Sequence, residues 1–261
     1  MTVDRIVEPL AKRSGERGFL AGTAALVTGG ARRIGRTLCR ALAQEGATVV
    51  VHYRDSEAAA AATVLELEAF GGEAFTVQGD LRDPNVASDL VASAAAEAGR
   101  PLDILVNNAS VFAQGFPGTT SVQEWDLHQA VNLRAPFILA RSFAAQVRNG
   151  TTGNIINLND FRAARPGGDH FAYTVSKAGL SGLTRSLALG LAPNIRVNEL
   201  ALGAVLAPEG APEGYIHTLK EQIPTRKFPS LDEVSHAMMF LLGNNAITGQ
   251  TIFVDGGRHL K

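Results

Sequence analysis

Short runs rich in β-branched residues alternate with longer stretches rich in Ala and Leu, and this alternation limits the possible folds more than any other feature. The longer stretches repeat apolar residues at helical spacing. Strands are predicted at residues 24–28, 48–52, 75–77, 104–106, 155–158, 195–197 and 251–254. Helices are predicted at residues 36–45, 56–70, 83–98, 122–148, 172–191 and 231–242. Strands separated by helices predict an α/β fold with a doubly wound parallel sheet that is buried on both faces.

The chain shows no internal repeat and no low-complexity linker, so one domain is expected over residues 21–261. Residues 1–20 mix basic and acidic side chains without a long apolar run and are expected to form an N-terminal extension. Residues 204–228 contain several Pro and Gly residues and predict a loop with a short helix. Ligands of such sheets bind beyond the carboxyl ends of the strands, so the functional residues are expected there.

Composition excludes several classes of function. Lys and Arg together number 24 and Asp and Glu 25, so the chain lacks the positive field of a general nucleic-acid binder. No apolar run reaches the roughly 18 residues that cross a bilayer, so no membrane partner is expected. The single cysteine, Cys39, forbids an internal disulfide, and the scattered histidines predict no metal site. These features favour a cytoplasmic protein that acts on a small molecule.

A glycine-rich turn, TGGARRIG at residues 28–35, follows the first predicted strand and leads into the first predicted helix. Glycines let the backbone approach a phosphate closely, and the helix N-terminus offers free N–H groups to a pyrophosphate. The turn in this context therefore predicts a dinucleotide site. The residues expected to hold the dinucleotide are Gly29, Arg32, Arg33, Ile34 and Gly35.

The turn resembles that of the short-chain dehydrogenase/reductase family, which has the pattern T-G-x-x-x-G-x-G. Arg33 replaces the middle glycine, as it does in the pteridine reductase branch of that family. The resemblance extends from about Leu20 to the end of the chain. It implies a single-domain Rossmann-type fold and a homotetramer in which the helices at 122–148 and 172–191 pack against other copies. The Arg33 guanidinium is expected to bond both phosphate and substrate.

The segment after the second predicted strand indicates the cofactor preference. Sites that prefer NAD usually place a carboxylate there to bind the ribose hydroxyl, whereas this chain has Tyr53 followed by Arg54. Arg54, with His52 and Ser56, is expected to hold a 2′-phosphate, and Asp55 to pair with Arg54. We therefore expect NADPH/NADP⁺ as the cofactor.

Three further segments match the family's cofactor site, and their role is implied by that resemblance. They contain Asp80 and Leu81, then Asn108, Ala109 and Ser110, and finally Gly203. Asp80 stands where the family's Asp contacts the adenine amino group, and a helix cap is the alternative role. Near Gly203 the family expects Pro-Gly, which this chain lacks. Glu199 is unusual in the same neighbourhood, and the resemblance implies no role for it.

Tyr173 and Lys177 lie four residues apart on a predicted helix and therefore share one face. Their context, FAYTVSKAGL, resembles the family's active-site helix. The resemblance implies that Tyr173 donates the proton, that Lys177 holds the nicotinamide ribose, and that Asn132 orders a water of the proton relay. The Lys177 ammonium and the positive nicotinamide ring are expected to lower the pKa of Tyr173.

Asp160 stands thirteen residues before Tyr173, where most of the family has Ser and pteridine reductases have Asp. A carboxylate suits a substrate with N–H donors or a ring nitrogen, and it should titrate together with Tyr173. Phe112 and Ser110 agree with the same branch, because the ring could stack on a pterin and the hydroxyl could bond its edge. With Arg33, they predict reduction of a C=N bond in a pterin-like substrate.

Two alternatives stay open. The first is an NADP(H)-dependent carbonyl or 3-oxoacyl reductase in which Asp160 is an unusual third residue. The second is a cofactor-binding regulator without turnover. The combination of Tyr173, Lys177 and Asn132 argues against the regulator, because nothing structural requires all three.

Overall fold

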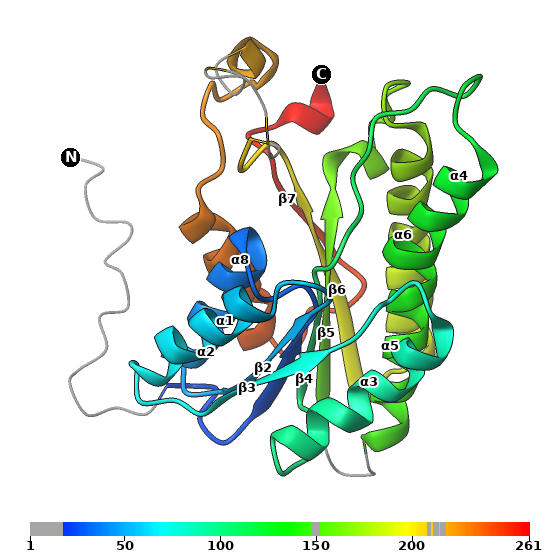
Figure 1. Ribbon diagram of the computed structural model, residues 1–261. Helices are drawn as coiled ribbons and strands as arrows, with labels where there is room; N and C mark the ends of the chain where they lie inside the picture. Colours follow the sequence, from blue (N-terminus) through cyan, green and yellow to red (C-terminus); the bar gives the residue numbers. More distant parts are fainter. Residues whose placement is uncertain (1–17, 148–151, 208–209, 211–213, 215–217) are drawn as a thin grey trace, which may run out of the picture.

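The computed structural model describes residues 18–147, 152–207, 210, 214 and 218–261, so most of the predicted extension at 1–20 lies outside the described residues. The described chain forms a seven-stranded parallel sheet in the order β3-β2-β1-β4-β5-β6-β7 (Figure 1). The strands are β1 Ala24–Val27, β2 Thr48–Tyr53, β3 Ala74–Gln78, β4 Ile104–Asn107, β5 Gly153–Asp160, β6 Ile195–Leu202 and β7 Thr251–Val254. The strand order reverses between β1 and β4, which confirms the predicted doubly wound Rossmann-type sheet.

Helices cover both faces of the sheet (Figure 1). One layer contains α1 Arg33–Gln44, α2 Glu57–Glu68 and α8 Leu231–Gly243. The other contains α3 Pro84–Glu97, α4 Val122–Gln129, α5 Ala135–Gln146 and α6 Phe171–Gly190. Alternate residues of β1 face the two layers: Ala25 and Val27 belong to the core under α1, and Ala24 and Leu26 to the core under α3 and α5. The sheet is therefore buried on both sides, as predicted.

The helix predicted at 122–148 contains an irregular segment that the sequence pattern did not place. Residues Ala130–Arg134 form a π-helical turn between α4 and α5. The irregular segment ends next to Pro136, which lies in the first turn of α5 and has no N–H to donate to the preceding turn. Residue 148, the predicted end, lies outside the described residues.

Strands β5 and β6 are longer than predicted. The prediction was too short because buried polar residues interrupt the apolar pattern that it relied on. Asn157, Asn159 and Glu199 interrupt the apolar pattern, yet each is at most 4% exposed. Hydrogen bonds compensate for their burial, for example from the Asn157 amide to the Thr184 hydroxyl at 2.8 Å. The extension of β5 is what carries Asp160 to the carboxyl end of the sheet.

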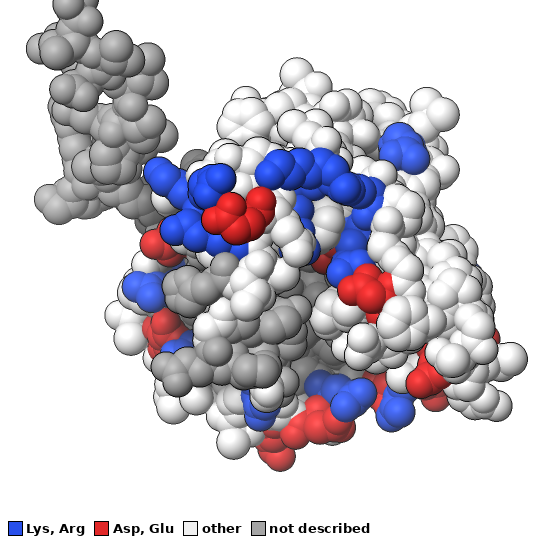
Figure 2. All heavy atoms as spheres, turned by 90° about the horizontal axis from the view of Figure 1, so that it is seen from above, with Lys and Arg blue, Asp and Glu red and all other residues white. Residues whose placement is uncertain are grey.

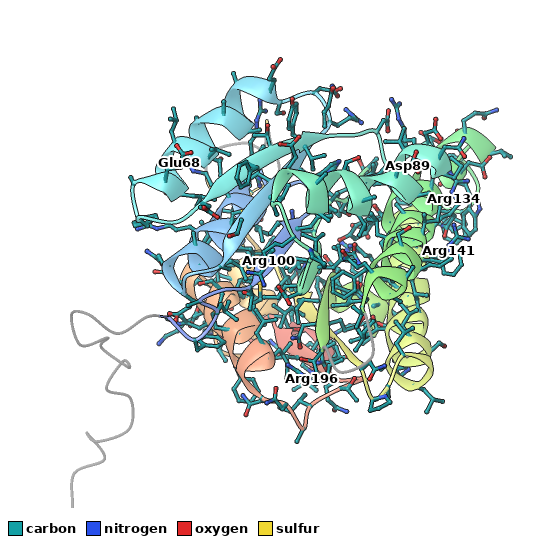
Figure 3. The ribbon with its side chains drawn as sticks, turned by 90° about the horizontal axis from the view of Figure 1, so that it is seen from below. Glu68, Asp89, Arg100, Arg134, Arg141 and Arg196 are labelled. Carbon is teal, nitrogen blue, oxygen red and sulfur yellow. The ribbon has the colours of Figure 1, made fainter. Side chains whose placement is uncertain are left out.

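Helix ends are fixed by side chains that the sequence identified only in part. Asp83 caps α3 by accepting the backbone N–H of Asn85, whereas Ser56 occupies the cap position of α2 without a side-chain bond. At the opposite end of the sheet (Figure 3), Arg196 of β6 donates to the carbonyls of Leu241 and Leu242 in the last turn of α8. Within the described residues, no helix combines the length and apolar character needed to span a membrane.

Candidate active site

The glycine-rich turn after β1 is held by hydrogen bonds to the end of β4. The Asn108 amide donates to the carbonyls of Thr28 and Gly29 at 2.9 and 3.0 Å. The Thr28 hydroxyl accepts the backbone N–H groups of Asn108 and Ala109. Gly29 has a φ of +62°, and a Cβ on Gly35 would overlap the Gly29 carbonyl. The turn therefore requires glycine at both positions, which lets a ligand approach its backbone closely.

His52, near the end of β2, supports this turn. The Gly29 N–H donates to its Nδ1 at 3.0 Å, and its Nε2 lies 3.0 Å from the Gly79 carbonyl oxygen. Burial lowers the pKa of His52 to about 4, so the ring is neutral at neutral pH. The prediction that His52 helps hold a 2′-phosphate is therefore wrong, because both ring nitrogens are occupied and the ring carries no charge.

A cavity of about 440 Å³ lies beside the turn, at the carboxyl ends of the strands that flank the order reversal. Its lining includes most of the residues predicted to bind the cofactor: Gly29, Arg32, Arg33, Ile34, Gly35, His52, Tyr53, Arg54, Ser56, Asp80, Leu81, Asn108, Ala109 and Ser110. The predicted residue Gly203 is not among the lining residues. It packs on Asp255 instead, where an added Cβ would lie 2.8 Å from the Asp255 Cα, and this close packing explains the glycine.

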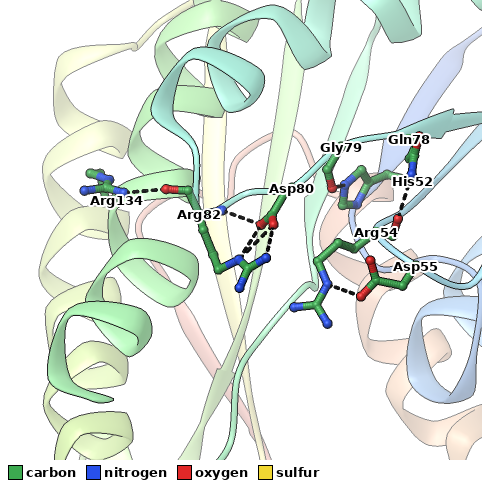
Figure 4. Close-up of polar contacts among 8 residues, drawn as sticks. All are labelled: His52, Arg54, Asp55, Gln78, Gly79, Asp80, Arg82 and Arg134. Atoms are coloured by element: carbon green, nitrogen blue, oxygen red, sulfur yellow. Dashed lines mark hydrogen bonds and ion pairs between the residues drawn. The ribbon is translucent and has the colours of Figure 1, made fainter. Parts of the chain in front are cut away.

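Two arginines near this cavity are each paired with a carboxylate, and their side chains project to the same side (Figure 4). Arg54 pairs with Asp55, as expected. Arg82, which the sequence analysis did not single out, donates from Nε to both oxygens of Asp80 at 2.9 and 2.8 Å. These bonds lower the pKa of Asp80. The alternative role of Asp80 as a helix cap is wrong, because Asp83 caps α3.

Arg33 adopts a φ of +51° at the position where a glycine is usual. Its Nη2 donates to the Ala207 carbonyl at 2.6 Å, in the segment that follows β6. The guanidinium therefore links the dinucleotide-type turn to the segment after the sixth strand. Seen from the carboxyl ends of the strands, Lys and Arg side chains gather along one side of this face (Figure 2).

Tyr173 of α6 and Asp160 at the end of β5 are in direct contact. The Tyr173 hydroxyl donates to Asp160 Oδ2 at 3.0 Å, and the Arg162 backbone N–H donates to Oδ1 at 2.8 Å. Tyr173 is 6% exposed. The structure therefore brings together the carboxylate and the phenol that the thirteen-residue spacing paired.

The surroundings of this pair raise both pKa values. Burial raises the pKa of Asp160, and burial followed by the Asp160 charge raises the pKa of Tyr173 well above its usual value. The prediction that Lys177 lowers the pKa of Tyr173 is wrong: among the protein's own groups, the effects that raise this pKa are larger. Lys177 Nζ donates to the Leu158 carbonyl at 2.8 Å and lies 5.7 Å from the centre of the Tyr173 ring, so burial dominates.

Lys177 is itself buried, and burial lowers its pKa to about 8. The charges of Asp160 and Glu199 act in the opposite direction and favour the ammonium form. The side chain is therefore a cation at neutral pH that titrates only slightly above it.

Asn132 lies in the π-helical turn and connects the cavity wall to α6. Its Oδ1 accepts the Val111 backbone N–H at 2.8 Å and the Ser110 hydroxyl at 3.1 Å. Its amide donates to the Ser176 hydroxyl at 3.0 Å, three residues after Tyr173. Such π turns are frequent at functional sites, because they redirect a side chain without ending the helix.

Phe112 lies beside Tyr173, with ring centroids 4.8 Å apart in an edge-on arrangement. One face of the Phe112 ring is stacked on His170, at a centroid distance of 4.2 Å. The sequence analysis counted His170 among scattered histidines and gave it no role. A ligand can therefore stack only on the other face of the Phe112 ring. Phe112 is 47% exposed.

The comparisons with known proteins agree with this geometry. Residues 29–259 match a family model described as enoyl-(acyl carrier protein) reductase. The chain is 33% identical to the 3-oxoacyl-[acyl-carrier-protein] reductase FabG of Staphylococcus epidermidis, over 90% of this chain and 98% of that protein. It is 30% identical to glucose 1-dehydrogenase 2 of Bacillus subtilis, over 92% and 96% of the two chains.

Among solved structures, FolM alternative dihydrofolate reductase 1 from Brucella canis, complexed with NADP, is 36% identical with a TM-score of 0.86, over 93% of this chain and 96% of that one. A blue fluorescent protein from a metagenomic library, in complex with NADPH, is 32% identical with a TM-score of 0.85, over 92% and 98%. The chain belongs to the short-chain dehydrogenase/reductase family. It is an oxidoreductase of that type.

Proposed function

We propose that this protein is an NADPH-dependent reductase that transfers hydride to a C=N bond of a pterin-like substrate. The observation that carries the proposal is the hydrogen bond between Tyr173 and Asp160 at 3.0 Å. It places a carboxylate beside the proton donor, at a position where a ketone reductase of this family usually has a hydroxyl.

The residues around the cavity beside the glycine-rich turn fit NADP(H). Glycine is required at the turn, where a Cβ on Gly35 would overlap the Gly29 carbonyl, and this leaves the backbone accessible to a pyrophosphate. Arg32 and Arg54 in the cavity lining supply positive charge for a 2′-phosphate, and the solved relatives above are complexes with NADP and NADPH. When bound, the cofactor supplies the hydride.

Four residues act on the substrate, on the cofactor or on the proton that accompanies the hydride. Tyr173 donates its proton to the substrate nitrogen, and Asp160 holds the phenol and accepts an N–H of the substrate. Lys177 holds the nicotinamide ribose as a buried cation. Asn132 positions the Ser110 hydroxyl, at 3.1 Å, toward the edge of the substrate.

The second candidate is a 3-oxoacyl reductase, which the identity to the Staphylococcus epidermidis FabG protein favours. In that reaction Asp160 would have to be protonated in order to donate to a carbonyl oxygen. Burial raises the pKa of Asp160, which makes this form more accessible than for an exposed carboxyl. The alternative therefore requires a rate that increases as the pH falls, whereas the pterin proposal needs the carboxylate.

The proposed assembly is a homotetramer built on α5 and α6. Phe137 on α5 and Leu189 on α6 are large apolar side chains that are 44% and 85% exposed. Covering them against other copies would remove apolar surface from water. Sedimentation of the purified protein would test this assembly.

The decisive experiment compares NADPH oxidation with dihydrobiopterin, dihydromonapterin, dihydrofolate and an acetoacetyl thioester. The expected result is the largest kcat/KM with a dihydropterin. A thioester that exceeds every pterin would establish the alternative. NADPH binding without turnover of any substrate would favour the regulator.

A further inference from the structure

Glu199 is a buried carboxylate in the middle of β6 that the proposed chemistry does not use. It is 1% exposed, and its partners in the sheet register are Asn157 on β5 and Thr251 on β7. A buried charge in such a place is costly unless polar groups replace the lost water. The residues around Glu199 must therefore supply such polar groups.

Side chains from three other elements bond this carboxylate. Oε1 accepts the hydroxyls of Ser181 on α6 and Thr251 on β7 at 2.6 and 2.7 Å. Oε2 accepts the amide of Asn159 on β5 at 2.8 Å, and the Thr184 hydroxyl lies 3.1 Å away. These donors supply the polar partners that a buried carboxyl group requires.

Two of these donors connect Glu199 to the candidate catalytic residues. Asn159 precedes Asp160, and its side-chain oxygen accepts the Asp160 backbone N–H at 2.9 Å. The same Asn159 amide lies 3.2 Å from the Lys177 carbonyl oxygen. Ser181 stands about one turn beyond Lys177 on α6. Glu199 therefore joins the strand end that carries Asp160 to the helix that carries Lys177.

The charge of Glu199 also acts on Lys177. The Lys177 Nζ donates to the neutral Leu158 carbonyl, and the charges of Asp160 and Glu199 favour its ammonium form. Asp160 also bonds Tyr173, feels the charge of Arg162 and acts on the pKa of His170, so its charge is not devoted to Lys177. The groups that bond Glu199 itself, namely Asn159, Ser181, Thr184 and Thr251, are all uncharged.

We propose that Glu199 is a positioning residue, whose carboxylate fastens the end of β5 to α6 and serves as a buried counter-charge for the Lys177 ammonium. Its catalytic meaning rests on the proposed function. The charge relation concerns only Lys177 and the cofactor ribose that this lysine would hold, so it can be measured without turnover.

The test is the pH dependence of NADPH affinity, measured by fluorescence on the full chain. In the wild type, the affinity should fall as the pH rises through about 8, where Lys177 loses its proton. This decrease is the alkaline limb of the affinity curve. In E199Q, which keeps the size of the side chain but not its charge, this limb should move about one unit to lower pH. E199D keeps the charge and shortens the side chain, so its limb should stay near that of the wild type. Active enzymes should show the same movement in kcat.

An unchanged limb in a folded E199Q would overturn the proposal and leave Glu199 a purely structural residue. If E199Q does not fold, E199D and E199N form a second matched pair, in which both side chains are shortened and only the charge differs. The limb of E199N is expected at lower pH than that of E199D, and equal limbs in this pair would overturn the proposal. If no substrate is reduced, the proposed function fails, while the NADPH-binding limb still decides the role of Glu199.

Discussion

The hydroxyl of Tyr173 donates to the carboxylate of Asp160, so the group expected to protonate the substrate is held by a group that would compete for the same proton. The Asp160 charge raises the pKa of Tyr173, and burial does so more strongly. In the proposed function, a phenol in this setting would keep its proton until the substrate nitrogen approaches. A substrate that brings its own N–H to Asp160 would release the phenol for that transfer.

Replacing Asp160 by Ser should therefore change the class of substrate. D160S should lose pterin reduction by at least about tenfold, because one charge-assisted hydrogen bond contributes roughly 1.5–3 kcal/mol. It should retain or gain reduction of an acetoacetyl thioester. The measurement is kcat/KM for both substrates. D160N is the matched control for shape, and unchanged pterin reduction in D160S would refute the assignment.

Removing the phenolic hydroxyl tests the proton donor. Y173F should lower kcat by about 100-fold, since general acid catalysis contributes a factor of this order. The affinity for NADPH should change little, because the ring is retained. Single-turnover kinetics with fluorescence titration would separate the two effects, and near-normal turnover would show that another group donates the proton.

Arg54 should determine the preference between NADPH and NADH. Its guanidinium is paired only with the exposed carboxylate of Asp55 in the described contacts and lines the cavity. R54A should raise the KM for NADPH by about tenfold or more, through loss of a charge-assisted bond to phosphate. The KM for NADH should hardly change. R100A, at the opposite end of the sheet, is the control (Figure 3), and equal effects on both cofactors would contradict this role.

The buried imidazole of His52 should make the protein less stable in acid. Its folded pKa is about 4, against an ordinary value of 6.5, so the unfolded chain binds a proton between these values that the folded protein does not. The free energy of unfolding is therefore unaffected by this group above about pH 6.5. It falls by roughly 3 kcal/mol as the pH falls toward about 4. Urea unfolding at several pH values would measure this loss.

A variant without the imidazole gives the control for that measurement. H52N should be less stable at neutral pH, because the Gly29 N–H loses its present acceptor. Its stability should depend less on pH over the same interval. An identical pH dependence in H52N and the wild type would assign the acid sensitivity to other groups.

The order of strands and helices was predictable because apolar periodicity reports burial directly. The glycine-rich turn, Asp160, Tyr173 and Lys177 also occupy the predicted region, since parallel strands bring their carboxyl ends to one edge. What local patterns could not show was the direction of each side chain. His52 lies on β2, two residues before Arg54, and its ring points inward to Gly29 and Gly79.

Other features depended on partners that are distant in the sequence. Asn159 and Glu199 are bonded across 40 residues, so the apolar pattern could register them only as interruptions. His170 becomes a stacking partner of Phe112 because the segment before α6 pairs with Gly115, in the segment that follows β4. Its signal in the sequence was its place three residues before Tyr173, and spacing alone does not separate a stacked ring from an ordinary cap.

The π-helical turn at Ala130–Arg134 accommodates about one residue more than the same turn of α-helix, so the number of residues in this segment matters as much as their identity. Deleting one residue there would restore ordinary winding while both flanks keep nearly the same orientation. The change would fall on the turn itself, where Asn132 would be drawn away from Ser176. An alignment with a relative that lacks the turn therefore needs a gap in this stretch, because without one it would equate residues that face different surroundings.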